Sequence, residues 1–268
     1  MIKFICFGSG SSGNCYYLCA NGYAILIDLG IGVRMLKRYC SNYGLPLAGI
    51  KAILVTHDHA DHVKAVGAFS HDFRVPVYAL KDTFMGMERN RLMTKKVAPP
   101  SMRIVQLKSA FALGPFSIEA FYVPHDSAAC CGYAIHVGDV SFCLITDAGH
   151  VTDDIRRHLA EARYVVVEAN YDEEMLRNGP YPEFLQQRII GPNGHMSNAE
   201  TADLLATNLS AEARHVWLCH LSQENNRPEL ALSAVELALR DSGRLTDSDS
   251  LVVQTLERRQ PTGPFELH

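Results

Sequence analysis

The sequence predicts a mixed α/β protein in which two β-sheets pack face to face with helices on the outside. Predicted strands occur in two batches, and predicted helices flank each batch. The 268 residues are long enough for a sizeable core, and 47% hydrophobic with 20% charged residues is typical of soluble globular proteins. We therefore expect residues 1–268 to form a single domain.

The first batch of strands lies in the amino-terminal part of the chain, where short apolar runs alternate with segments of helical periodicity. Strands are predicted at residues 2–7, 15–19, 24–30, 52–55 and 75–79, and helices at residues 33–43, 63–73 and 82–93. Gly44 and Pro46 end the first of these helices, and Pro99 with Pro100 breaks the pattern after the third.

The second batch begins with strands alone and then alternates with helices. Strands are predicted at residues 103–107, 116–123, 132–137, 141–146, 164–168, 215–219 and 251–253. Helices are predicted at residues 153–161, 171–190 with a break at 178–180, 198–209 and 229–240. Ser197 and Glu200 have the spacing of a capping box, and Pro228 suits the first turn of the last helix.

Composition limits the kinds of partner that we expect. The formal net charge is −4, so the overall field would not attract a polyanion, and any nucleic-acid contact must be local. None of the eight cysteines forms a CxxC pair and no secretory signal precedes them, which favours reduced, buried thiols in a cytoplasmic protein over disulfides or a thiolate metal site. The longest apolar runs are too short to span a bilayer, so no membrane association is expected.

Residues 56–62, with the sequence THDHADH, concentrate potential metal ligands directly after a buried strand. His57 and His59 are two residues apart, so an extended chain points both side chains the same way. Asp61 and His62 follow where the chain turns into a helix, so they can face a second ion beside the first. Four ionisable groups at a strand end are costly without ions or partners, which makes a purely structural role a poor explanation.

Further candidate ligands lie at the carboxyl ends of later predicted strands. These are His125, Asp147, Glu168 and His220. Any one of them alone would more often be a cap, a turn or a surface residue, but the series behind a dense ligand cluster indicates a shared site. Asp28 also ends a strand, and it either caps the helix that begins near residue 32 or braces the metal site.

Residues 56–62 match the HxHxDH motif of the metallo-β-lactamase superfamily, and the spacing of Asp28, His125, Asp147 and His220 matches its other motifs. The chain thus resembles this superfamily over nearly its whole length, which implies a four-layer αββα sandwich. The resemblance implies that His57, His59 and His125 bind one divalent ion, that Asp61, His62 and His220 bind another, and that Asp147 bridges the two. It also implies that Asp28 orients ligands from behind.

Two later residues narrow the class of reaction. Glu168 and His195 resemble the glutamate-plus-histidine arrangement of the phosphodiesterase branch, as in ribonuclease Z, although a lone His195 would more often be a loop residue. Residues 8–14 and 194–198 are most similar to the YycJ/WalJ-like family, whose activity is described as phosphodiesterase with 5′ exonuclease action on DNA. The chain has neither the long arm of ribonuclease Z nor an inserted β-CASP domain, and both absences disfavour a structured RNA substrate.

The implied chemistry is hydrolysis by hydroxide held between two ions, for which Zn²⁺ and Mn²⁺ are both suitable. Asp61 would also orient the hydroxide, and His195, held by Glu168, would protonate the leaving oxygen or stabilise its charge. One set of candidates for substrate contact is Ser9, Ser12 and Asn14, in a loop that is either a plain connection or part of the rim of the site. The other candidates are Arg89 and Arg91, in a basic stretch that is either a solvated face or a patch that binds the nucleic-acid backbone.

Two other functions remain open from the sequence. A thioester or lactone hydrolase of the glyoxalase II type would use the same ions, but it has no particular need for Glu168 and His195, and no basic glutathione-binding carboxyl-terminal region is evident. A non-catalytic metal-binding regulatory module is the second alternative, and the complete ligand set argues against it. The oligomeric state does not follow from the sequence.

Overall fold

The structure is a computed structural model that describes residues 1–246 and 250–268. The chain divides into two compact units. Unit 1 comprises Met1–Ala120, Ser127–Cys131 and Glu257–His268, and unit 2 comprises Phe121–Asp126 and Gly132–Leu256. The single domain expected over residues 1–268 stays a prediction.

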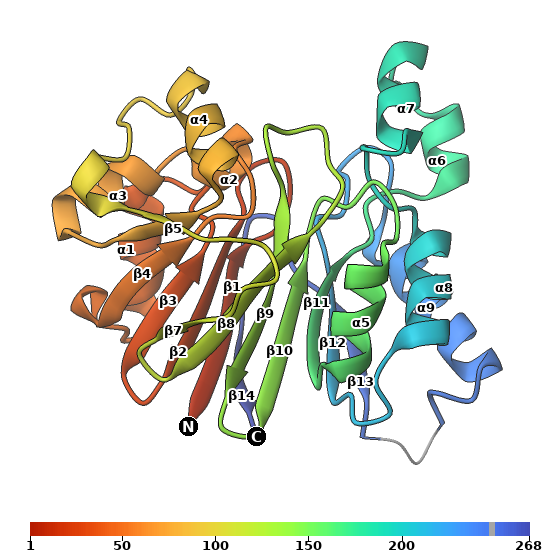
Figure 1. Cartoon of the computed structure of the whole chain (residues 1–268). Helices are drawn as coiled ribbons and strands as arrows, with labels where there is room; N and C mark the ends of the chain where they lie inside the picture. Colours follow the sequence, from red (N-terminus) through yellow and green to blue (C-terminus); the bar gives the residue numbers. More distant parts are fainter. Residues whose placement is uncertain (247–249) are drawn as a thin grey trace. The chain divides into compact units, whose positions relative to one another are not determined.

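Unit 1 contains a seven-stranded sheet with the strand order β14-β1-β2-β3-β4-β5-β6 (Figure 1). Its strands are β1 (Ile2–Gly8), β2 (Cys15–Ala20), β3 (Tyr23–Ile27), β4 (Ile50–Leu54), β5 (Val77–Ala79), β6 (Met102–Ile104) and β14 (Thr262–Leu267). Strands β1 to β3 pair antiparallel, whereas β3 to β6 pair parallel. The parallel strands therefore end at the same edge of the sheet, where their side chains can converge.

Four α-helices accompany this sheet: α1 (Val33–Asn42), α2 (Ala60–Val63), α3 (Val66–Phe73) and α4 (Lys81–Arg89). Their apolar positions join the sheet in one hydrophobic core, in which Leu36 of α1 and Phe69 of α3 are fully buried with Leu26 and Ile53 of the strands. Burial of side chains of this size stabilises the fold by about 1.5–3 kcal/mol each. The core thus holds the ends of β3 and β4 rigidly.

A second seven-stranded sheet has the strand order β13-β12-β11-β10-β9-β8-β7. Its strands are β7 (Phe111–Leu113), β8 (Phe116–Tyr122), β9 (Cys131–Val137), β10 (Val140–Ile145), β11 (Tyr164–Glu168), β12 (His215–Cys219) and β13 (Val252–Thr255). Strands β10 to β13 pair parallel. All five residues of β11 are buried, as expected for a parallel strand inside a sheet.

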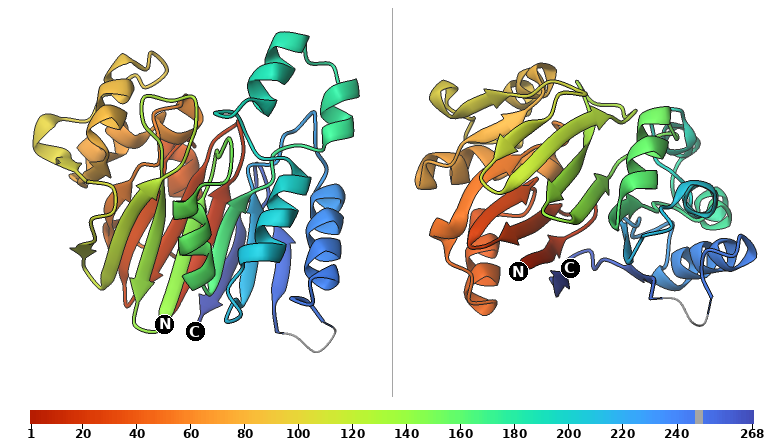
Figure 2. Two further views of the ribbon diagram at one scale, coloured as in Figure 1. Left: turned by 45° about the vertical axis from the view of Figure 1, so that its right-hand side comes forward. Right: turned by 60° about the horizontal axis from the view of Figure 1, so that its bottom comes forward.

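The helices of unit 2 are α5 (Asp153–Glu161), α6 (Glu173–Asn178), α7 (Glu183–Ile190), α8 (Asn198–Asn208) and α9 (Pro228–Asp241). Helices α5, α8 and α9 lie along the strands of unit 2, whereas α6 and α7 lie beyond their ends (Figure 2). Leu176 and Ile189 are buried together with Tyr171 in a small cluster at this pair of helices. The segment between β11 and α8 is therefore an ordered structure with its own apolar contacts.

Two sheets flanked by helices confirm the predicted fold class, and most predicted elements are present within a few residues of their expected bounds. The helix predicted at residues 63–73 is wrong in its first part, because α2 ends at Val63 and α3 starts at Val66. Strands β7 and β14 were not predicted. Pro264 lies inside β14, and proline removes a ladder donor, so a strand containing it is tolerated at the sheet edge that β14 occupies.

None of the eight cysteines, all of which the structure describes, forms a disulfide, and all except Cys19 are buried, as predicted. Burial raises the pKa of Cys40 to about 11, which keeps this thiol protonated at neutral pH. Among the helices of residues 1–246 and 250–268, none is long and apolar enough to cross a membrane.

Candidate metal centre

The motif at residues 56–62 lies directly after β4 and runs into α2. His57 and His62 are buried, whereas His59 and Asp61 are partly exposed. The ring centroid of His57 lies 4.8 Å from that of His59 and 4.0 Å from that of His62. Nε2 of His62 lies 3.6 Å from Oδ2 of Asp61. Unit 1 thus gathers three imidazoles and a carboxylate at the end of one parallel strand.

Asp28 supports this motif from within unit 1. Its carboxylate, which is fully buried, lies 2.7 Å from Nδ1 of His62. It also accepts hydrogen bonds from the backbone N–H and the hydroxyl of Thr56, both at 2.8 Å. Helix α1 has Gly32 as its N-cap and no side-chain cap hydrogen bond, so Asp28 does not cap it. A carboxylate on Nδ1 fixes the imidazole and leaves Nε2, which contacts Asn14, as the nitrogen that would bind an ion.

Asn14 and Ser9 belong to the loop after β1, and both are fully buried. The Asn14 amide lies 2.9 Å from Nε2 of His62 and 3.3 Å from Oδ2 of Asp61, and its backbone N–H donates to the Asp61 carbonyl at 2.7 Å. The Ser9 hydroxyl lies 3.2 Å from the hydroxyl of Tyr16. Both side chains therefore brace the interior of unit 1, and their contact with substrate stays a prediction.

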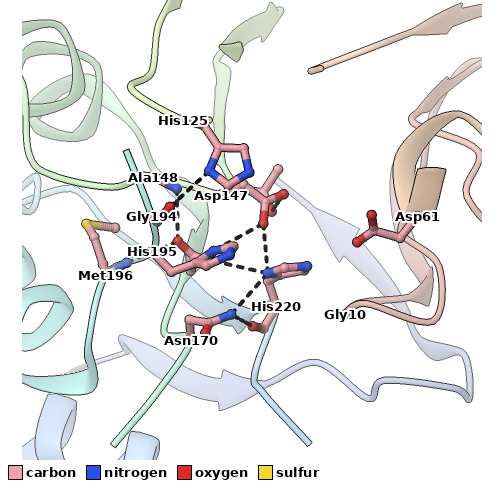
Figure 3. Close-up of polar contacts among 12 residues, drawn as sticks. Gly10, Asp61, His125, Asp147, Ala148, Asn170, Gly194, His195, Met196 and His220 are labelled. Carbon is pink, nitrogen blue, oxygen red and sulfur yellow. Dashed lines mark hydrogen bonds and ion pairs between the residues drawn. The ribbon is translucent and has the colours of Figure 1, made fainter. Parts of the chain in front are cut away.

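In unit 2, the parallel strands β10, β11 and β12 bring three predicted site residues together. Asp147 follows β10, Glu168 ends β11 and His220 follows β12. Nδ1 of His220 lies 2.8 Å from Oδ1 of Asp147 (Figure 3). It also lies 3.1 Å from Oε1 of Glu168. The three residues are at most 4% exposed. This convergence follows from the parallel pairing, which aligns the carboxyl ends of the three strands.

His195 joins this cluster from the loop before α8. Its Nδ1 lies 2.6 Å from Oε1 of Glu168 and 3.5 Å from Oδ1 of Asp147, and its side chain is 19% exposed. The other carboxylate oxygen of Glu168 accepts the backbone N–H groups of Ala148 and Met196 at 2.9 and 3.3 Å. Glu168 is thus fixed from several directions, and it holds a histidine that reaches the surface.

Burial and charge have opposite effects on the pKa values of His195 and Glu168. Burial lowers the pKa of His195, but the negative charge and hydrogen bond of Glu168 outweigh burial and raise that pKa above its ordinary value. Burial likewise raises the pKa of Glu168, while the charge and hydrogen bond of His195 lower it on balance. The pair therefore favours a protonated imidazole beside an ionised carboxylate.

His125 follows β8, and its side chain is 1% exposed. Its Nδ1 lies 2.9 Å from the carbonyl oxygen of Gly194, the residue before His195 (Figure 3). Asp126 pairs with Arg188 of α7 at 2.5 Å. Both contacts tie the loop after β8 to the segment that carries His195.

The donors fit a hard or borderline divalent cation. In unit 2, Asp147, Glu168, His195 and His220 each offer one ligand atom, and these atoms all lie within 4.8 Å of one another. Imidazole nitrogen and carboxylate oxygen are the ligands that Zn²⁺ and Mn²⁺ accept in proteins. Buried acidic and imidazole groups at such separations are expensive without cations to balance them.

The remaining predicted residues are exposed on unit 1. Ser12 is exposed in the loop after β1, and Arg89 and Arg91 are exposed at and just after the end of α4. In the same basic stretch, Lys96 donates to the carbonyl oxygens of Met87 and Asn90 at 2.9 and 2.6 Å. Its charge therefore stabilises the end of α4.

Several residues that support these clusters have little or no signal in the sequence. Asn170 donates to the His220 carbonyl at 2.8 Å, and its amide lies 3.2 Å from the His220 ring (Figure 3). Asp58 accepts the backbone N–H of Ala128 at 2.9 Å, and Asn90 donates to the Asp58 carbonyl at 2.7 Å. The one available signal was position, because Asn170 lies two residues after Glu168.

The fold and these clusters define the class of protein. The structure is similar to that of the metallo-β-lactamase fold protein YhfI from Bacillus subtilis, with a TM-score of 0.71 and 15% sequence identity over 97% of this chain and 98% of that one. Residues 23–221 match the model of the beta-lactamase superfamily domain, and the chain belongs to that superfamily. It is therefore a metal-dependent hydrolase with the metallo-β-lactamase fold, and its His and Asp clusters indicate use of divalent metal.

Two relatives of this chain have names that state a particular activity. The chain is 33% identical to exodeoxyribonuclease YycJ of Bacillus anthracis over 242 residues, which is 90% of each protein. It is 34% identical to exodeoxyribonuclease WalJ of Streptococcus pneumoniae serotype 2 (strain D39) over 229 residues, which is 85% of each.

Proposed function

We propose that the protein is a dinuclear-metal-dependent phosphodiesterase that degrades DNA as a 5′ exonuclease. The observation that carries the proposal is the Glu168–His195 pair, joined at 2.6 Å beside Asp147 and His220. Hydrolysis of a thioester or lactone needs no such pair, whereas departure of a sugar oxygen from phosphorus benefits from an acid. The two exodeoxyribonuclease relatives support DNA as the substrate. The cytoplasmic location expected from the sequence accords with this role.

We assign the ions to seven ligands, with Zn²⁺ or Mn²⁺ as the metal. His57, His59 and His125 would hold one ion, Asp61, His62 and His220 the other, and Asp147 would bridge them. The support within each unit is the grouping of Asp61 with His62, and of Asp147 with His220. The bound ions would supply an activated water and neutralise charge on the phosphoryl oxygens.

The chain's own residues then have separate tasks. Asp28 holds His62 through Nδ1, and Asn170 holds His220 through its backbone carbonyl. Glu168 occupies Nδ1 of His195, which leaves Nε2 to donate a proton to the leaving oxygen. A positioned acid of this kind typically contributes about 10²- to 10⁴-fold in rate. Asp61 would also orient the attacking water.

The test is a panel of single- and double-stranded DNA and RNA, labelled at the 5′ or the 3′ end, with a thioester assayed in parallel. We expect a chelator to abolish DNA hydrolysis, and Zn²⁺ or Mn²⁺ to restore it. We also expect 5′-labelled DNA to release labelled nucleotides from the earliest times. Faster turnover of the thioester than of DNA would contradict the proposal.

A further inference from the structure

A pocket of about 210 Å³ opens in unit 1 between the loop after β1, the beginning of α1 and the segment before β14. Its wall is mainly apolar and includes Ile31, Met35 and Tyr39. Its polar lining includes Ser12, Arg258 and Arg259. An apolar wall beside two guanidinium groups suits a ligand that combines a flat ring with a negative charge.

Hydrogen bonds to residues 258 and 259 hold the pocket together, and two of them go to the backbone carbonyls of these residues. The Tyr39 hydroxyl donates to the carbonyl of Arg259 at 3.0 Å, and the Ser9 N–H donates to the carbonyl of Arg258 at 3.3 Å. The Arg259 side chain donates to the Ser12 hydroxyl at 3.4 Å. The two arginines are therefore fixed at the pocket through their main chain.

Two predicted metal ligands, Asp61 and His62, contact residues that are adjacent in sequence to the pocket lining. Gly13, in the pocket wall, precedes Asn14, which contacts both Asp61 and His62. Ile31, also in the wall, follows Gly30, where an added Cβ would lie only 1.5 Å from the Asp61 carbonyl oxygen. Two lining residues of the pocket are therefore direct sequence neighbours of Asn14 and Gly30, which lie against the motif at residues 56–62.

Charge favours an anionic ligand at this place. Helix α1 carries Arg34, Lys37 and Arg38 and no acidic residue. The Arg38 guanidinium lies 5.4 Å from the ring centroid of Tyr39, which lines the pocket. Arg258 and Arg259 add two positive charges at this pocket, on a chain of net charge −4, and Glu257 adjoins them in sequence.

We propose that this pocket binds one nucleotide of the DNA strand next to the phosphodiester that is cleaved. The base would pack against Met35 and Tyr39, and the phosphate of that nucleotide would contact Arg258 and Arg259. The inference rests on the proposed function, and it names a substrate-binding site outside the metal-ligating residues. Arginine is suited to this role because its planar fork binds phosphate through two hydrogen bonds and also stacks on aromatic rings.

The test compares wild type with the double variant Arg258→Gln, Arg259→Gln on a short single-stranded DNA and on bis-p-nitrophenyl phosphate, which has no neighbouring nucleotide. We expect the KM for DNA to rise about tenfold with little change in kcat, since hydrogen bonds to charged groups have this magnitude. The dependence of DNA binding on salt should weaken by about 0.7 in log–log slope per lost phosphate contact. Hydrolysis of bis-p-nitrophenyl phosphate should be unchanged.

The matched control is Arg156→Gln, Arg157→Gln, which removes the same charge from an adjacent arginine pair on α5 in unit 2 and should leave both activities unchanged. An unaltered KM and salt slope in the Arg258, Arg259 variant, while wild type degrades DNA, would overturn this inference and leave the proposed function intact. An equal loss on both substrates would also overturn it. Wild type that hydrolyses neither substrate would refute the proposed function itself.

Discussion

Three residues of the candidate site adopt left-handed backbone conformations that non-glycine residues seldom use. The φ angles are 59° at Asp28, 51° at Asp147 and 52° at His220. Each residue follows a strand, so the left-handed turn redirects its side chain where the sheet ends. Such a conformation costs about 1–2 kcal/mol per residue, and strain of this kind accumulates at functional sites. The fold thus accepts local strain in order to aim these side chains.

Gly30 offers a test of how closely the loop after β3 supports Asp61. A Cβ at position 30 would lie 1.5 Å from the Asp61 carbonyl oxygen, so Gly30→Ala must displace the motif backbone. We expect this variant to lose at least about 3 kcal/mol in free energy of unfolding, measured with urea, and to bind less metal.

Gly49→Ala is the matched control for Gly30→Ala, because its added Cβ would meet its nearest neighbours at an ordinary 3.5 Å. We expect it to keep both the stability and the metal content of wild type. If Gly30→Ala were as stable and as metal-rich as Gly49→Ala, the close packing of Gly30 on Asp61 would have no role.

Sequence patterns predicted the side chains that gather within each unit because each follows a recognisable strand or belongs to a dense motif. The same patterns did not reveal the role of Asn170 or the hydrogen bonds of Asp58. Hydrogen bonds from amide side chains, such as that of Asn90, form only where segments distant in sequence meet in the fold. The burial of Ser9 and Asn14 was equally hidden, since a Gly- and Ser-rich loop reads as surface in a sequence. Position along a strand is a local property, whereas a hydrogen-bond partner is a tertiary one.

Among the helices, α8 begins two residues after Met196 and follows its N-cap Ser197, close in sequence to His195. The capping box predicted from the sequence is present: the Ser197 hydroxyl accepts from the Glu200 N–H at 3.1 Å, and the Glu200 carboxylate accepts from the Ser197 N–H at 2.8 Å. We expect Ser197→Ala to lower the free energy of unfolding by about 1 kcal/mol in a denaturant titration. Ser197→Asn should retain most of that stability, and an equal loss in both variants would exclude capping as the cause.

Element boundaries were predictable where periodicity and end signals agree. Helix α5 and strands β11 and β12 match their predicted bounds, because α5 has helical spacing of its apolar residues and each strand is a short apolar run. Strand β14 was missed since Pro264 argues against a strand, and β7 was missed because three residues carry too little pattern. Strand β14 forms by pairing with β1, which is distant in sequence, and β7 forms by pairing with β8. The local sequence of neither strand encodes this pairing.

At the scale of the whole molecule, stability should depend on pH through His215 at the start of β12. This ring is stacked on Trp217, with 4.0 Å between ring centroids, and burial lowers its pKa to about 4. The unfolded chain, with an ordinary pKa near 6.5, binds more protons between these values, so stability falls as pH falls from about 6.5 to about 4.

His215→Gln should remove this part of the pH dependence. We expect wild type to lose about 1 kcal/mol more than the variant between pH 7 and pH 5, a figure discounted for the partial exposure of the ring. Urea unfolding at the two pH values measures the difference. Parallel pH profiles for the two proteins would show that His215 titrates alike in the folded and unfolded states.

The central claim is that His195, held by Glu168, acts on a metal-bound phosphodiester without being needed to bind the metal. The most direct measurement is metal content together with the rate of DNA hydrolysis in wild type, His195→Ala and the control His150→Ala, whose wild-type ring is exposed and lies 2.7 Å from the Pro192 carbonyl. We expect His195→Ala to retain the metal of wild type and to lose about 10²- to 10⁴-fold in kcat, while His150→Ala keeps both. Loss of metal from His195→Ala, or a rate equal to that of wild type, would contradict it.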